Sequence, residues 1–184
     1  VANFNFGGME NITATTMADT EILFARFNKG AVEDLVAHEL AHAWFGNLVT
    51  CRNWAELWLN EGFATFFEAA YREKMNGRAD YLRKIREDSL SAMSADLNEP
   101  RYALFNTLAD PNNDNSLFNT VTYQKGGAVI HTLRETVGEE AFWKALKIYL
   151  NRHKFANVET PDLQKVMEEA SGKNLDWFFK QWVY

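Results

Sequence analysis

Apolar residues recur at intervals of three and four positions through most of the chain after Gly30. This spacing places apolar side chains on one face of an α-helix. A first helix is predicted from Gly30, with one apolar stripe made of Val32, Leu35, Val36, Leu40 and Ala43. Further helices are predicted over residues 54–75, 79–95, 120–136, 139–153, 161–170 and 175–182. Thr160 is predicted to cap the helix that begins at Pro161.

Residues 1–27 follow a different pattern. β-Branched and aromatic residues alternate with polar ones, as over residues 11–16 and 21–24, which is typical of strands. The prolines and asparagines of residues 98–115 predict a long loop. We therefore expect a single α+β domain over the whole chain, mainly helical, with a strand-rich part over residues 1–27 and a helical part over residues 28–184.

The composition fits one compact protein with a substantial core. The chain has 184 residues, 47% of them hydrophobic, and only three prolines. It is long enough to bury most of the surface that its unfolded form would expose. The net charge of -6 argues against nucleic acid and anionic membranes as partners. No apolar run reaches the roughly 18 residues that a membrane-spanning helix needs.

The cysteine content and the first residues bear on location. The single cysteine, Cys51, excludes an intrachain disulfide, so a soluble protein in either a cytoplasmic or an exported location is compatible with the sequence. The first residues have neither the basic start nor the apolar run of a signal peptide, and the chain begins without Met. We expect the chain to be a piece of a longer polypeptide.

The most informative chemistry lies in the segment His38-Glu39-Leu40-Ala41-His42. On a helix, residues four apart lie on the same face about 6 Å apart, so both imidazoles can bind one metal ion at about 2.0 to 2.1 Å. Glu39 lies about 100° around the helix from His38. It borders the metal without having to bind it, which is the position of a general base for the attacking water.

Glu61 supplies a third ligand from the next predicted helix. Catalytic zinc sites use three protein ligands and keep a fourth position for water, and two histidines with a distant carboxylate are one standard set. His38, His42 and Glu61 therefore predict one Zn²⁺ per chain, in preference to two buried histidines and a surface glutamate that match the pattern by chance. His131 and His153 have no comparable partners and are expected to be capping or surface residues.

Three separated motifs resemble one known family. The motifs are Gly7-Gly8-Met9-Glu10-Asn11, then His38-Glu39-Leu40-Ala41-His42 with Trp58-Leu59-Asn60-Glu61-Gly62, and Tyr123-Gln124-Lys125-Gly126. In this order they are similar to the catalytic domain of the gluzincin metalloaminopeptidases, the aminopeptidase N and leukotriene hydrolase family. The resemblance covers nearly the whole chain. It implies a thermolysin-like fold, with a strand-rich lobe beside a helical lobe and zinc at their junction.

The resemblance implies a role for each matching residue. His38, His42 and Glu61 would bind zinc. Glu39 would act as the general base, and Tyr123 would stabilise the transition state. A phenol hydroxyl opposite the metal can donate to the oxyanion that forms when water attacks a peptide carbonyl. A tyrosine at a helix start that packs on the core is the alternative for this position.

Glu10 and the residues before it are implied to bind the substrate. A fixed carboxylate near the metal can pair with a protonated α-amine, which separates an aminopeptidase from an endopeptidase. Gly7 and Gly8 lack side chains and let an extended substrate approach a strand edge, and Met9 belongs to the same motif. The alternatives are a polar residue at a β-turn and a glycosylation site at Asn11.

Glu68 lies two helical turns after Glu61 on the same predicted face, and the family has a glutamate there. Metal-bound histidines usually donate their other N–H to a carboxylate or a carbonyl, so Glu68 is predicted to orient a ligand. A solvated glutamate on the helix surface is the alternative.

Removal of N-terminal residues from peptides with a free N-terminus is therefore the expected function. A thermolysin-type zinc endopeptidase and a non-catalytic scaffold are the alternatives. Members of the family have an upstream β-domain and a downstream helical domain, so flanking domains of a parent protein are expected partners. Where leukotriene-hydrolysing members carry an acidic residue, this chain has Asn115, which disfavours epoxide hydrolysis.

Overall fold

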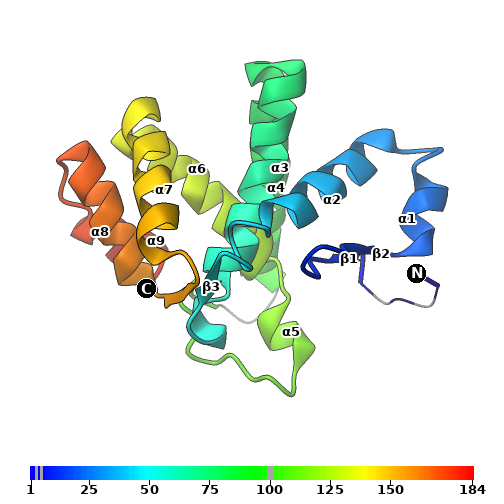
Figure 1. Cartoon of the computed structure of the whole chain (residues 1–184), viewed down its shortest axis with the longest axis horizontal. Coiled ribbons are helices and arrows are strands. Elements are labelled where there is room, and N and C mark those ends of the chain that lie inside the picture. Colours follow the sequence, from blue (N-terminus) through cyan, green and yellow to red (C-terminus); the bar gives the residue numbers. More distant parts are fainter. Residues whose placement is uncertain (3, 5, 99–101) are drawn as a thin grey trace.

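The computed structural model describes residues 1–2, 4, 6–98 and 102–184. Within these ranges the chain is mainly helical (Figure 1), which confirms the expected fold class. The helices are α1 (Asp19–Phe24), α2 (Lys29–Ala41), α3 (Trp58–Asn76), α4 (Arg78–Asn98), α5 (Asp114–Leu117), α6 (Gly126–Val137), α7 (Glu139–His153), α8 (Thr160–Ser171) and α9 (Asp176–Trp182). A 3₁₀ turn, η1 (Trp54–Glu56), precedes α3, and a π-helical turn, η2 (Val121–Lys125), precedes α6. No helix of the described residues is long and apolar enough to cross a membrane.

Short strands join distant segments of the described chain. β1 (Gly8–Met9) pairs antiparallel with β2 (Thr16–Met17). β3 (Val49–Cys51) pairs parallel with β4 (Ala156–Val158). The second pair ties the segment that follows α2 to the segment that leads into α8, so the two ends of the helical region are held together.

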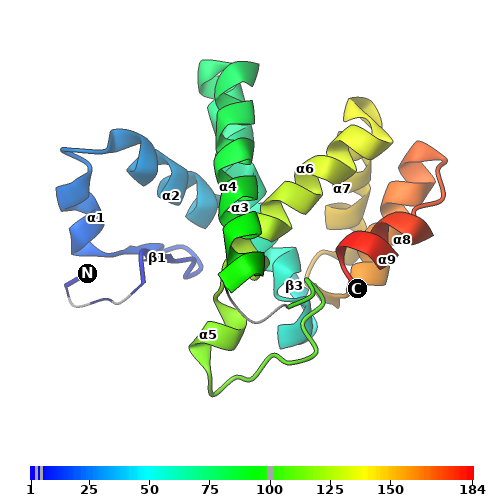
Figure 2. The same cartoon turned by 180° about the vertical axis from the view of Figure 1, so that it is seen from behind.

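Helix α3 lies at the centre of the described helices. It packs against α2, α4 and α6, and it stands between α2 and α6 in both views (Figure 1, Figure 2). Residues 58–66 are buried on every face of the helix. Phe63 stacks on Phe45 with ring centroids 4.2 Å apart, and Phe66 meets Phe142 edge to face at 5.5 Å. A helix enclosed in this way is a rigid support for the side chains that it carries.

The N-terminal part contains less strand than its composition predicts. Residues 21–24 belong to α1, so the strand predicted there is wrong. Asp19 and Glu21 lie in the first turn of this helix, where carboxylates interact favourably with the helix dipole. In the segment 11–16, only Thr16 enters a strand. Such short apolar runs do not distinguish a strand from one helical turn.

Helix α8 begins one residue earlier than predicted. Thr160 is its first residue, and Glu159 caps it in a capping box with Asp162, whose carboxylate accepts the Glu159 N–H at 2.9 Å. Thr160 is instead fully buried. Its Oγ1 donates to Glu56 Oε2 at 2.6 Å and accepts from Trp58 Nε1 at 3.1 Å. The predicted cap therefore serves to join α8 to the start of α3.

The apolar stripe predicted on α2 does not face the core. Val36 and Leu40 are 49% and 61% exposed, whereas Asp34, His38 and Glu39 are buried. The pattern predicts the helix correctly and its buried face wrongly, because this helix packs through a polar face against α3.

Candidate active site

Helices α2 and α3 bring the three predicted metal ligands together. His38 lies in the last turn of α2, His42 ends that helix, and Glu61 faces them from the first turn of α3. Glu61 Oε2 lies 3.2 Å from His38 Nε2 and 3.3 Å from His42 Nε2. All three residues are buried, and their ligand atoms lie within 4.8 Å of one another. Two helices that pack side by side thus form one cluster of nitrogen and oxygen donors.

The Nδ1 atom of each imidazole already has a hydrogen-bond partner outside the cluster. His42 Nδ1 lies 2.8 Å from the carbonyl oxygen of Phe45, which can only accept, so Nδ1 carries the proton. His38 Nδ1 lies 2.8 Å from Glu68 Oε1. Neutral imidazoles in this tautomer direct their Nε2 lone pairs toward the Glu61 carboxylate. Three electron-pair donors that face one another require a proton or a cation between them.

The pKa values of His38 and Glu61 are shifted in the directions that favour a positive charge in the cluster. Burial lowers the pKa of His38, but hydrogen bonds with Glu61 and Glu68 outweigh it and raise the pKa to about 10. Burial raises the pKa of Glu61, but hydrogen bonds with His38 and His42 outweigh it and lower the pKa to about 2. The pocket therefore stabilises positive charge between these groups. Two imidazoles and one carboxylate are a donor set that suits Zn²⁺.

Glu39 lies beside this cluster with one oxygen unused. Glu39 Oε2 is one of three buried side-chain polar atoms without a hydrogen-bond partner among the described residues. Burial raises the pKa of Glu39, and His38 and His42 oppose that shift only in part. A buried, unpartnered carboxylate oxygen with a raised pKa can accept a proton from water. A Cβ on Gly8 would collide with this carboxylate, so a glycine allows β1 to pass here.

Glu10 follows β1 into the same region. Glu10, Glu39 and His42 offer ligand atoms within 4.8 Å of one another. Asn47 Nδ2 donates to the backbone carbonyl oxygen of Glu10 at 2.9 Å, which holds this segment against the loop that follows α2. Two carboxylates at one point of a cavity attract a cation, and an ammonium group is one that fits.

A single cavity of about 1150 Å³ contains these side chains. Its lining includes every residue predicted to act in the site: Gly7, Gly8, Met9, Glu10, His38, Glu39, His42, Glu61, Glu68 and Tyr123. The structure thus brings together segments that are separated by more than a hundred residues in the sequence. A cavity of this size accommodates a short peptide.

Tyr123 reaches the cluster from the π-helical turn η2. Its ring stacks on that of His38, with centroids 5.8 Å apart and planes inclined by 16°. Burial, reinforced by the charges of Glu61 and Glu10, raises the pKa of Tyr123, so the phenol stays protonated. Tyr123 is therefore a hydrogen-bond donor beside the cluster.

A close contact between two glycines positions η2. A Cβ on Gly126 would lie 2.9 Å from the Cα of Gly62, which is closer than packed atoms approach. Glycine at both positions lets the segment that carries Tyr123 lie directly on α3. The motifs around Glu61 and Tyr123 thus contain the contact that joins them.

Two contacts of the site were not predicted. The Phe45 carbonyl faces His42 because the chain turns at Gly46, whose φ of 135° favours glycine. The other is Lys84 of α4, which lies 2.8 Å from Glu68 Oε2. In the sequence its only signal is an Asp four residues later, a spacing that many exposed helices share.

The remaining histidines lie away from the cavity. His131 is partly buried, and its Nδ1 lies 2.7 Å from the hydroxyl oxygen of the buried Tyr81, so the expected capping or surface role is wrong for this residue. His153 lies in the last turn of α7, where a basic residue is favoured, as expected.

Comparisons with known proteins agree with this arrangement. The model of the Peptidase family M1 domain matches residues 1–182. Glutamyl aminopeptidase of Bos taurus is 36% identical over 191 residues, which cover 100% of this chain and 20% of that protein. Aminopeptidase N of Streptomyces lividans is 36% identical over 200 residues, which cover 100% of this chain and 22% of that protein. The chain therefore spans about a fifth of the length of these curated relatives.

Solved structures share the fold. A variant of the M1 zinc metallopeptidase of Deinococcus radiodurans, bound to a Tyr-Ser-Ala substrate, matches with a TM-score of 0.76 and 27% identity, over 98% of this chain and 37% of that chain. Another structure of the M1 zinc metallopeptidase of that organism matches with a TM-score of 0.75 and 26% identity, again over 98% and 37%. Zinc is the metal named for these neighbours. The chain belongs to peptidase family M1.

Proposed function

We propose that this chain carries the catalytic site of a zinc aminopeptidase, which hydrolyses the first peptide bond of substrates with a free N-terminus. The observation that carries the proposal is the position of Glu10 beside Glu39 and His42, in one cavity with the metal-ligand cluster. The relatives named above are aminopeptidases, which supports the same conclusion.

His38, His42 and Glu61 would hold the zinc ion. When bound, zinc supplies a Lewis acid that makes water a nucleophile near neutral pH and polarises a carbonyl oxygen. The histidine tautomers suit this task, because both Nδ1 atoms face partners outside the cluster.

The protein's own groups supply the proton transfers and the orientation. Glu39 accepts a proton from the attacking water through its free oxygen and delivers it to the leaving amine. Tyr123 donates a hydrogen bond from its hydroxyl group to the oxyanion of the tetrahedral intermediate and keeps its proton. Glu10 pairs with the α-ammonium group, which sets the distance from the chain end to the scissile bond.

The N-terminal segment provides the surface on which the peptide substrate binds. Gly8 lies beside the Glu39 carboxylate and Gly7 lies beside Leu35, and Met9 is 40% exposed next to them. An extended peptide can add to such a strand edge through backbone hydrogen bonds. The greater length of the relatives suggests that flanking domains of the parent protein complete this binding surface.

The two alternatives are less well supported. A zinc endopeptidase of thermolysin type needs the metal ligands and Glu39, but not a second carboxylate at Glu10. A non-catalytic scaffold needs neither an unpartnered buried carboxylate oxygen nor a protonated tyrosine beside a metal-ligand cluster. The aminopeptidase accounts for all of these features.

Glu10→Ala tests the proposed function most directly. We expect kcat/KM for peptides with a free N-terminus to fall about 10- to 100-fold, the effect of losing one charge-assisted hydrogen bond. The wild-type protein should cleave the same peptides poorly after N-acetylation, and Glu10→Ala should change that slow rate little. Parallel assays of matched free and acetylated peptides measure both effects. Equal losses on both substrates would favour the endopeptidase.

Tyr123→Phe tests the role of the phenol hydroxyl. The ring and its stacking on His38 remain, so we expect an unchanged zinc content and little change in KM. We expect kcat to fall on the order of 100-fold, because only the transition state develops the oxyanion that the hydroxyl stabilises. Steady-state kinetics separate the two parameters. A rise in KM alone would assign Tyr123 to substrate binding.

A further inference from the structure

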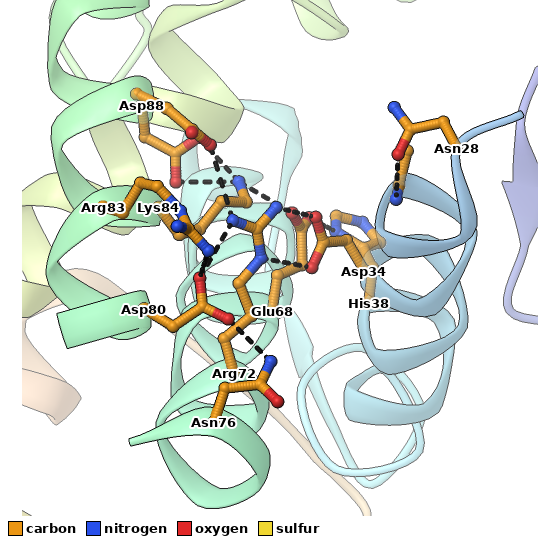
Figure 3. A network of polar contacts seen from close by, with 12 residues as sticks. Asn28, Asp34, His38, Glu68, Arg72, Asn76, Asp80, Arg83, Lys84 and Asp88 are labelled. Atoms are coloured by element: carbon orange, nitrogen blue, oxygen red, sulfur yellow. Dashed lines mark hydrogen bonds and ion pairs between the residues drawn. The ribbon is translucent and has the colours of Figure 1, made fainter. Parts of the chain in front are cut away.

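A buried ammonium group lies behind the metal-ligand cluster. Lys84 of α4 is 2.8 Å from Glu68 Oε2, and it contacts both oxygens of Asp88 at 2.7 and 2.9 Å (Figure 3). The side chains of Lys84 and Asp88 are only 9% and 6% exposed. A buried lysine with two carboxylate partners and little water has a defined position, unlike a lysine on a surface.

Both oxygens of Glu68 are in use. Oε1 lies 2.8 Å from His38 Nδ1, and Oε2 lies 2.8 Å from Lys84 Nζ. A carboxylate bound at one oxygen can rotate about its last bond, because that torsion is broad. The contact with Lys84 restricts this rotation, and the fixed carboxylate in turn sets the plane and the tautomer of the imidazole. Burial raises the pKa of Glu68, but its contacts with His38 and Lys84 outweigh burial and keep it below its usual value.

The contacts from His38 through Glu68 and Lys84 to Asp88 form one row of charged and polar side chains. A second row lies beside it, one helical turn away. Arg72 of α3 forms a bidentate pair with Asp34 of α2, with Arg72 Nε 2.8 Å from Asp34 Oδ1. On α4, Asp80 lies 3.7 Å and Glu87 3.5 Å from Arg72 Nη1. Figure 3 shows both rows crossing from α2 through α3 to α4. The two rows fix the register of the three helices, so α2 cannot slide without breaking charged contacts.

Helix packing alone does not account for the buried charges. Removing an ammonium and two carboxylates from water carries a large desolvation penalty, and apolar residues of similar size often pack with equal or better stability. The Lys84 row ends on the nitrogen of a metal ligand, at His38. A role in orienting that ligand explains why the charges lie at this place.

We propose that Lys84 is a positioning residue of the metal site, which acts through Glu68 to hold the His38 imidazole in the orientation that binds the metal. The proposal rests on the zinc site described under the proposed function. It makes α4 part of the metal site, although α4 carries none of the three ligands. Metal affinity, measured without any substrate, is therefore the direct readout.

The test uses a double variant of the full-length protein. Lys84→Met alone would leave Asp88 buried without its partner and could prevent folding. Lys84→Met/Asp88→Leu removes both charges and should fold, as judged by circular dichroism and by thermal unfolding of the metal-free protein. Competition with a chromogenic chelator should show zinc affinity about 10-fold weaker than that of the wild type, the lower end for groups that orient ligands.

Arg134→Met is the matched control. Arg134 is also buried, and its guanidinium binds Glu73 and Glu139, each at 2.8 Å, away from the cavity. This variant should lower the thermal stability and leave zinc affinity unchanged. The comparison separates an effect on the metal site from a general loss of stability.

Combining the double variant with Glu68→Leu tests whether Lys84 acts on the metal site through Glu68. If Lys84 acts through Glu68, adding Lys84→Met/Asp88→Leu to Glu68→Leu should change zinc affinity by less than about two-fold, because coupled residues are not additive. A folded double variant with wild-type zinc affinity would overturn the proposal, and so would a full additional loss in the Glu68→Leu background. Absence of zinc binding by the wild-type protein would instead reject the zinc site itself.

Discussion

Glu39→Gln is expected to lower kcat by about 1000-fold while the zinc content stays the same. The amide keeps the shape of the side chain but cannot accept a proton at neutral pH. The free Oε2 atom of Glu39 is the group that the reaction would use, and it is not part of the cluster of His38, His42 and Glu61. The substitution therefore separates proton transfer from metal binding.

Steady-state kinetics on a free peptide and elemental analysis of the dialysed protein check both halves of this result. Glu33→Gln is the matched control, because Glu33 lies on the same helix, is 41% exposed at its side chain and pairs with Lys29 at 3.2 Å. It should behave as the wild type. Near-normal turnover by Glu39→Gln would place the general base at another residue.

His42→Ala is expected to abolish both metal binding and turnover. The His42 side chain is almost fully buried and contributes one of the three donors, with Nε2 3.3 Å from Glu61. Its loss leaves two ligands in a pocket shaped for three. We expect zinc affinity to fall by more than the 10- to 100-fold that is typical when only a group that orients a ligand is lost.

Elemental analysis after dialysis should give close to one zinc per wild-type chain and much less for His42→Ala. His131→Ala is the control, because His131 contacts Tyr81 outside the cavity and should leave zinc binding intact. Full zinc occupancy in His42→Ala would remove this residue from the ligand set.

The local chemistry of the site could be predicted from residue spacing. Two histidines one helical turn apart must point the same way, and Glu39 between them must point beside them, whatever the rest of the chain does. The structure places Glu61, Glu68 and Tyr123 next to His38, and their roles stay predictions. The thermolysin-like arrangement of lobes and the single-domain organisation stay predictions.

Helix content was predictable for a similar reason. The predicted bounds of α7, residues 139–153, agree with the structure, since its apolar period and its start after Gly138 are local signals. The helices predicted over residues 54–75 and 120–136 each begin with a different turn, η1 or η2. The turn η2 lies where Gly126 packs closely on Gly62 of α3, a contact between residues far apart in sequence.

The sequence by itself thus determined most of the helices after Gly30 and the motifs that contain the candidate metal ligands, because a helix and a short motif depend on neighbours within one or two helical turns. Only the tertiary structure decided that α2 buries its polar face, that Lys84 reaches Glu68, and that Glu10 lies beside Glu39. Periodicity reports which face of a helix is apolar. It does not report which helices will pack together, and charges on α2, α3 and α4 become partners only after that packing has brought them within reach.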